Sequence, residues 1–250
     1  MNSKIFAFTI VSLFLLIATS ACTNQEGSSE SDSESTEMVL VDQVLTEQDQ
    51  QALTPDGILE GLKEGNQRFV NNNLTLRDYQ AQVNKTSSGQ YPEAVVIACI
   101  DSRVPVEAIF DKGVGDIFVA RVAGNFVNED ILGSTEFGTA VAGSKVVVVM
   151  GHEHCGAVKS AIDDVELGNI TAMLSNIMPA VENTEAEFEG EQSSSNDDYV
   201  TQVAHNNVRY TIEQMRERSS IIADLEQNGE VVIAGAFYDL DTGEVTFLDE

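Results

Sequence analysis

The chain has 250 residues, of which 42% are hydrophobic and only 4 are proline, a composition typical of one globular domain or at most two small ones. Its 13 Lys and Arg residues are far outnumbered by 41 Asp and Glu, which gives a formal net charge of -28. A chain this acidic repels nucleic acid and anionic lipid, so we exclude nucleic-acid binding.

The first 22 residues have the pattern of an export signal. Lys4 gives a positive start, residues 5–18 form a short apolar core, and small residues 19–21 precede Cys22. The apolar core is too short to span a membrane comfortably. Residues 19–22, which end this pattern, resemble a bacterial lipobox. This resemblance implies that signal peptide 1–21 is removed and Cys22 is lipidated. The protein would then be exported and lipid-anchored in the cell envelope, on the periplasmic side of an outer membrane or the outer face of the cell membrane. The alternative is an ordinary cleaved signal that leaves Cys22 free.

Two acidic stretches are predicted to lie outside the globular core. Residues 22–50 contain eight acidic residues and no Lys or Arg, so low hydrophobicity and like charge predict an unfolded tether. Residues 182–198 contain seven acidic residues and no base, and are predicted to be an exposed insertion. The folded domain is accordingly predicted to be 51–250.

The elements between these stretches predict an α/β fold. Thr54 and Pro55 start a predicted helix that ends near Asn73. Continuous apolar runs then predict buried strands at 94–98, 116–120 and 145–150. Further elements are predicted in this order: a helix from 156, an amphipathic helix over 199–218, a short helix over 219–228, and a strand pair at 230–237 and 244–248. Strands that alternate with helices favour a mostly parallel central β-sheet flanked by helices.

Cys99 and Cys155 admit two interpretations. Counting cysteines in an exported protein favours a disulfide between them. Their surroundings favour a metal site, because His152 lies three residues before Cys155. Cys99 and His152 each follow a predicted strand, and α/β sheets bind their ligands at the carboxyl ends of strands. Two thiolates and an imidazole make a three-ligand zinc site with one open position, as a catalytic zinc needs. Asp101 and Arg103 can pair bidentately beside Cys99, and a disulfide explains neither of them.

These residues carry a resemblance to a known family. The motifs Cys99-Ile100-Asp101-Ser102-Arg103-Val104 and Gly151-His152-Glu153-His154-Cys155-Gly156 resemble the β-class carbonic anhydrases, as do segments 64–69, 120–125 and 235–243, in family order. The resemblance implies one Zn²⁺ per chain, held by Cys99, His152 and Cys155. Zinc lowers the pKa of its bound water towards neutrality, so hydroxide becomes available to attack CO₂. The implied activity is the reversible hydration of CO₂ to bicarbonate and a proton.

The resemblance also implies roles for residues around the metal. Asp101 would accept the hydrogen bond of the attacking hydroxide, and Arg103 would hold that carboxylate away from the zinc. Gln90 resembles the family's substrate-orienting glutamine. The remaining substrate-pocket positions are Phe118, Ala123, Phe137 and Gly156. Pockets of the family form between two subunits, which implies a homodimer or a higher homo-oligomer in which Gln90 and Phe118 serve the partner chain's zinc.

Two other functions fit the same residues. Relatives hydrolyse CS₂ or COS on the same fold and metal, and nothing in the sequence around the site excludes this. The other is a non-catalytic zinc or redox domain in the cell envelope that binds a partner through the acidic stretch 182–198. Asp101, Arg103 and Gln90 argue against this reading, because a structural zinc needs none of them and normally has four protein ligands.

Overall fold

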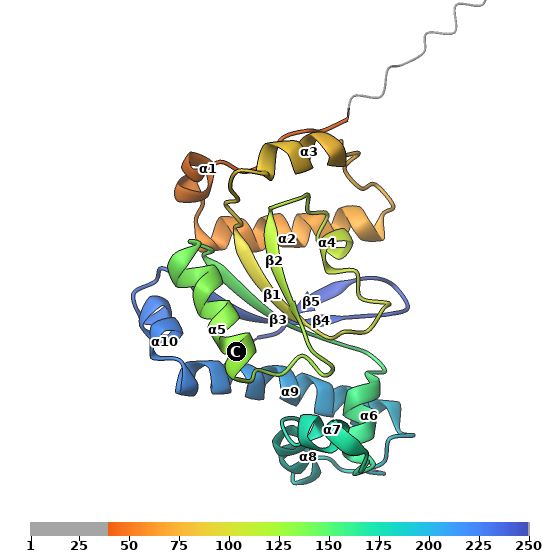
Figure 1. Cartoon of the computed structure of the whole chain (residues 1–250). Helices are drawn as coiled ribbons and strands as arrows, with labels where there is room; N and C mark the ends of the chain where they lie inside the picture. The colour runs from red at the N-terminus through yellow and green to blue at the C-terminus, as the bar shows by residue number, and fades with distance from the viewer. Residues whose placement is uncertain (1–39, 250) are drawn as a thin grey trace, which may run out of the picture. The chain divides into compact units, whose positions relative to one another are not determined.

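The computed structural model describes residues 40–249, which form an α/β fold around one five-stranded sheet (Figure 1). The strand order is β2-β1-β3-β4-β5. The sheet is parallel except for β5, which is antiparallel to β4. The strands are β1 (Ala94–Ala98), β2 (Ile117–Arg121), β3 (Val146–His152), β4 (Val232–Tyr238) and β5 (Val245–Phe247). The predicted α/β class and mostly parallel sheet are confirmed.

The central strands β1 and β3 are buried along their whole length, which explains their unbroken apolar sequences. Ala98 at the end of β1 lies opposite Met150 of β3. Beyond that point β3 continues for two residues more than predicted, since Gly151 and His152 pair with Phe237 and Tyr238 of β4. His152 therefore belongs to a strand rather than to the following loop.

Helices cover both faces of the sheet (Figure 1). One core contains alternate strand residues such as Val96 and Val148 with Ile58 and Leu62 of helix α2 (Pro55–Val70). The residues between them, such as Ile97, share a second core with α9 and α10. The other helices are α1 (Glu47–Ala52), α3 (Tyr79–Thr86), α4 (Val106–Ile109), α5 (Glu129–Glu136), the π-helix η1 (Phe137–Val141), α6 (Gly156–Ile162), α7 (Gly168–Leu174), α8 (Met178–Glu185), α9 (Asp197–Arg218) and α10 (Ser220–Gln227).

The predicted tether is too long at its carboxyl end. Residues 40–50 belong to the fold, since the backbone of Val41 bonds to Leu76 and Asp78. Helix α1 begins with a capping box between Thr46 and Asp49. Gln50 is buried, and its side-chain amide donates to the carbonyls of Pro92 and Ala142. Acidic composition was misleading here, because Asp49 caps a helix and Asp42 pairs with Lys85. Signal peptide 1–21, Cys22 and the tether up to residue 39 lie outside the described residues.

Residues 182–198 include parts of two helices as well as a loop. The end of α8 and the start of α9 fall within them, and all seven acidic side chains are exposed. Phe188 in the connecting loop packs edge-on against Tyr199, with ring centroids 5.1 Å apart. Asp197 and Asp198 occupy the first turn of α9, where negative charge is favourable. The stretch is thus an ordered, acidic helix connection.

Among residues 40–249, no helix combines the length and hydrophobicity needed to cross a membrane.

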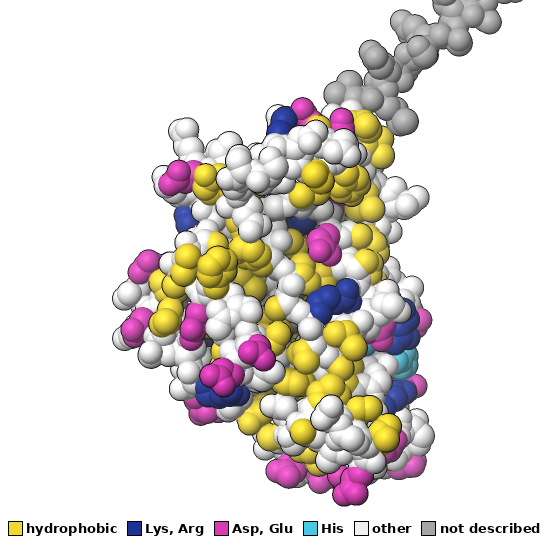
Figure 2. All heavy atoms as spheres, in the orientation of Figure 1, with side chains coloured by type: hydrophobic (Ala, Val, Ile, Leu, Met, Phe, Trp, Pro, Cys, Tyr) yellow, Lys and Arg dark blue, Asp and Glu magenta, His cyan; other side chains and the backbone are white. Residues whose placement is uncertain are grey.

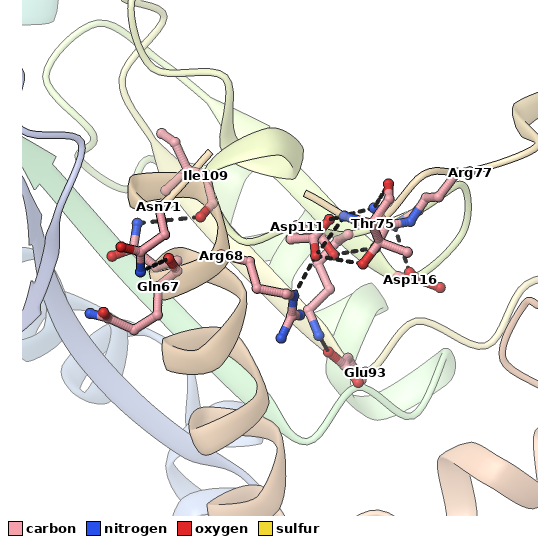
Figure 3. Close-up of polar contacts among 12 residues, drawn as sticks. Gln67, Arg68, Asn71, Thr75, Arg77, Glu93, Ile109, Asp111 and Asp116 are labelled. Atoms are coloured by element: carbon pink, nitrogen blue, oxygen red, sulfur yellow. Dashed lines mark hydrogen bonds and ion pairs between the residues drawn. The ribbon is translucent and has the colours of Figure 1, made fainter. Parts of the chain in front are cut away.

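Asp111, just after α4, is the centre of a buried ionic cluster that holds Thr75 and Arg77 against α2 (Figure 3). Its carboxylate accepts hydrogen bonds from Arg68 Nε at 2.6 Å, Arg77 at 2.5 Å and Thr75 Oγ1 at 2.7 Å. Burial alone raises the pKa of Asp111, but these hydrogen bonds outweigh it and lower the pKa to about 2. The carboxylate therefore stays ionised in the folded chain.

We expect Asp111→Asn to lower the free energy of unfolding at pH 7 by about 3 kcal/mol, because it leaves two arginines without their shared carboxylate. An unfolded Asp titrates near about pH 4, so the wild-type stabilisation is complete above that pH and is lost as pH falls towards 2. Urea unfolding from pH 7 to pH 3 should show a steeper acid loss in wild type than in the variant. Asp42→Asn, which breaks the exposed pair with Lys85, is the matched control. Equal losses in the free energy of unfolding for the two variants would contradict the proposed contribution of the buried cluster to stability.

Candidate metal centre

Three side chains capable of binding a metal converge at the carboxyl ends of β1 and β3. Cys99 follows β1 directly, His152 is the last residue of β3, and Cys155 is the N-cap of α6. One ligand atom from each lies within 4.8 Å of the others, and all three residues are buried. The structure therefore brings together residues 56 positions apart in sequence.

The two cysteines are free, and their Sγ atoms are 4.0 Å apart. Two thiolates bound at about 2.3 Å to one tetrahedral zinc lie about 3.8 Å apart. The observed spacing fits a shared metal, and the disulfide alternative does not describe this structure.

The orientation of His152 selects one ring nitrogen as the ligand. Nδ1 lies 2.8 Å from the carbonyl oxygen of Glu153, which can only accept, so Nδ1 carries the proton. Nε2 is then an acceptor, and it is buried without a hydrogen-bond partner. A buried imidazole nitrogen with a free lone pair beside two thiols is a ligand atom for a metal ion, which would satisfy it.

The thiols interact strongly with each other. The pKa of Cys99 is lowered, mainly by a hydrogen bond from Cys155, with a further hydrogen bond from the backbone N–H of Gly124. The pKa of Cys155 is raised, because it keeps the proton shared with Cys99 and because it is buried. A divalent cation binds both sulfurs as thiolates, so its binding would release the protons of these thiols.

Asp101 and Arg103 form a bidentate ion pair beside this cluster. Arg103 Nε donates to Asp101 Oδ1 at 3.0 Å and its Nη2 donates to Oδ2 at 2.7 Å. Hydrogen bonds from Arg103 hold the pKa of the Asp101 carboxyl well below its usual range. Oδ2 of Asp101 lies 4.0 Å from His152 Nε2. An ionised acceptor is thus fixed next to the metal ligands.

Two supporting residues escaped prediction. Arg121 donates to the carbonyls of Cys99 and Asp101, at 2.8 Å and 2.6 Å, and so fixes the loop that carries both side chains. The backbone N–H of Gly124 donates to Cys99 Sγ at 3.3 Å. Gly124 has a φ of +86°, and a Cβ there would lie 2.4 Å from Ile177 Cδ1. Both lie in segment 120–125, but only the fold shows what they contact.

The predicted substrate-pocket residues are not all gathered at the metal cluster of this single chain. Phe118 and Phe137 contact each other edge-on, with centroids 6.5 Å apart, and line a hollow of about 580 Å³ beside β2 and α5. None of the three metal-binding residues is among its described lining residues. Gln90 is exposed in the loop before β1. Ala123 adjoins Gly124, and Gly156 is exposed at the start of α6.

Comparisons with known proteins agree with the fold and the donor set, which together define a zinc enzyme of α/β architecture. Residues 94–245 match the sequence model of the family described as carbonic anhydrase. Carbonic anhydrase 2 of Mycobacterium tuberculosis is 32% identical over 204 residues, which cover 78% of this chain and 93% of that protein. A carbonic anhydrase of Mycolicibacterium smegmatis is 35% identical over 200 residues, covering 76% and 92%.

The fold matches solved structures of the same class. One of two tetrameric β-carbonic anhydrases from Sordaria macrospora superposes with a TM-score of 0.59 at 25% identity, covering 67% of this chain and 85% of that one. This chain belongs to the β-carbonic anhydrase family. Hydration of CO₂ is that family's function, and Cys99, His152 and Cys155 fit its zinc site.

We expect the purified chain to contain one zinc ion, as measured by metal analysis after exhaustive dialysis. Cys155→Ser should lose most of the metal, because it removes one of three protein ligands. Cys22→Ser is the matched control and should keep a full complement. A full complement of zinc in Cys155→Ser would contradict the assigned donor set.

Proposed function

We propose that this chain interconverts CO₂ and bicarbonate plus a proton, with Asp101 and Arg103 acting directly beside the zinc. The observation that carries this proposal is the bidentate Asp101–Arg103 pair, whose Oδ2 lies 4.0 Å from the metal-binding nitrogen of His152. A purely structural zinc site needs no such pair and has four protein ligands. Here the donor cluster within residues 40–249 supplies three.

The chemistry divides between the metal and the chain. Zinc, when bound, supplies Lewis acidity that lowers the pKa of a coordinated water. Asp101, held ionised by Arg103, can only accept a hydrogen bond, so it would accept one from the attacking oxygen and orient a lone pair of that oxygen towards CO₂. Arg103 occupies both carboxylate oxygens and keeps Asp101 from becoming a fourth metal ligand. Arg121 holds the backbone of the same loop.

Asp101→Asn should keep its zinc but lower kcat for CO₂ hydration by about 100-fold, because an amide can donate where the carboxylate must accept. A stopped-flow pH-indicator assay measures the rate, and metal analysis checks the zinc. Asp224→Asn, an exposed position on α10, is the matched control. Wild-type protein that holds zinc but shows no activity between pH 7 and 9 would contradict the function itself.

We also propose that the active unit is a homodimer formed across the edge strand β2. This strand pairs only with β1, so its outer edge is unpaired among the described residues. Hydrophobic side chains gather in front of β2 and α5 (Figure 2). Phe137 and Val141 of η1 are 55% and 71% exposed. Exposed apolar side chains beside a free edge favour an interface, and the structural relative from Sordaria macrospora is tetrameric. Such a dimer would bring Gln90 and Phe118 to the partner's zinc.

Complementation between two inactive variants tests that sharing. Gln90→Ala keeps the zinc ligands, whereas Cys155→Ser keeps Gln90 but loses the metal. If Gln90 serves the partner's zinc, mixed dimers purified through two different tags should regain activity at one intact site per dimer. Mixed dimers no more active than the Gln90→Ala homodimer would show that Gln90 acts within its own chain.

The proposed location is the cell envelope, with a lipid anchor at Cys22. This rests on the export pattern of residues 1–21 and on the lipobox-like ending before Cys22. An acidic segment then separates the anchor from the folded residues.

Cells that express the full chain should yield a membrane-bound protein that incorporates labelled fatty acid. Cys22→Ala should abolish the labelling, because it removes the acylated thiol, while Cys99→Ala should keep it. Equal labelling of the wild type and Cys22→Ala would contradict the anchor.

A further inference from the structure

A second, apolar cleft lies at the β4–β5 side of the sheet, away from the edge strand β2. It has a volume of about 400 Å³ and is formed by α2, α9, β4 and β5. Its walls are mainly aliphatic and aromatic, and include Leu59, Ile212, Val232 and Phe247. None of the metal-binding residues lines it. A cleft of this size lies within the range of small-molecule sites.

Two cations at this cleft have neither a carboxylate nor a backbone carbonyl as a partner within the described residues. Lys63 of α2 and Arg209 of α9 both line it. Within residues 40–249, neither takes part in an ion pair. The Lys63 ammonium lies 5.5 Å from the centroid of the Phe247 ring, and among the described residues Arg209 donates only to Asn206, at 3.3 Å. Among the described residues, Arg121, Lys145 and Arg218 also form no ion pair, but each donates to backbone carbonyls, whereas Lys63 and Arg209 do not.

The other charges at the cleft leave this positive excess in place. Arg216 also lines the cleft and is paired with Glu226, at 2.7 Å. Asp249 is the one carboxylate among the described lining residues, and it forms no ion pair with Lys63 or Arg209 within the described part of the chain. The rim is therefore cationic while the walls are apolar.

We infer that this cleft binds an amphipathic carboxylate, with a single apolar chain between α2, α9 and the sheet and its anionic head at Lys63 and Arg209. Burial of the apolar chain against the walls supplies most of the affinity. Charge-assisted hydrogen bonds to the head select an anion over a cation or an alcohol of the same length. Neither part depends on the zinc site, so the inference stands apart from CO₂ hydration.

Isothermal titration with decanoate tests the site in the zinc-loaded full chain carrying Cys22→Ala, which cannot be acylated. We expect saturable binding of one decanoate per chain below its micelle concentration. Acetate, which lacks the chain, and decyltrimethylammonium, which reverses the charge, should not bind measurably. Equal binding of decanoate and decyltrimethylammonium would overturn the inference, since it would indicate unselective adsorption to apolar surface.

Three variants locate the binding. Lys63→Gln with Arg209→Gln should raise the dissociation constant at least about tenfold, because the head loses its charged donors. Ala234→Leu, which narrows the cleft without changing its charge, should weaken binding similarly. Lys85→Gln, on α3, is the matched control and should bind as wild type. All should keep wild-type zinc content and CO₂ hydration, which shows that they are folded.

An unchanged dissociation constant in the double variant and in Ala234→Leu would place the ligand elsewhere and overturn the inference. Absence of saturable decanoate binding to the protein with an unmodified cleft would also overturn the inference. Light scattering completes the test: if decanoate bound only to dissociated chains, the cleft would be an interface between copies rather than a ligand site.

Discussion

The register between β1 and β3 is the constraint on which the active centre depends. Ala98 lies opposite Met150, so Cys99 and His152 both lie at the carboxyl ends of their strands, on the same end of the sheet. A slip of one residue would turn His152 to the other face of the sheet. Pairing of His152 with Tyr238 extends β3 far enough to fix the imidazole. Gly151 permits this, because a Cβ there would lie 2.8 Å from Val208 Cγ2 on α9.

Charged side chains are abundant at the surface of this chain, whereas those near the metal site and the core form specific ion pairs. The Asp101–Arg103 pair presents one fixed acceptor to the metal site, while Asp111 binds two arginines to hold a loop. Most acidic residues of 182–198 have no such role and remain exposed. Basic residues are scarce, and some described ones have no carboxylate partner. Arg121, Lys145 and Arg218 donate to backbone carbonyls instead, whereas Lys63 and Arg209 lie at the apolar cleft.

The sequence predicted the sheet and the metal donors because both depend on local patterns. Strands β1 and β3 are continuous apolar runs, and Cys99, His152 and Cys155 stand at recognisable spacings beside them. The acidic composition of residues 40–50 predicts a tether, which is wrong because composition does not reveal a capping box or the buried hydrogen bonds of Gln50. Gly124 and Arg121 contact a sulfur and backbone carbonyls, which no residue pattern encodes. Gln90 is exposed in the single chain, and its proposed contact with substrate needs a second chain, so one subunit does not define that contact.

The most direct test of an open zinc position is a crystal structure of the zinc-loaded protein at neutral pH. We expect zinc on Cys99, His152 and Cys155, an exchangeable water as the fourth ligand, and Asp101 still paired with Arg103. An Asp101 oxygen or another protein side chain in the fourth position would contradict the open site, and with it the proposed role of the Asp101–Arg103 pair.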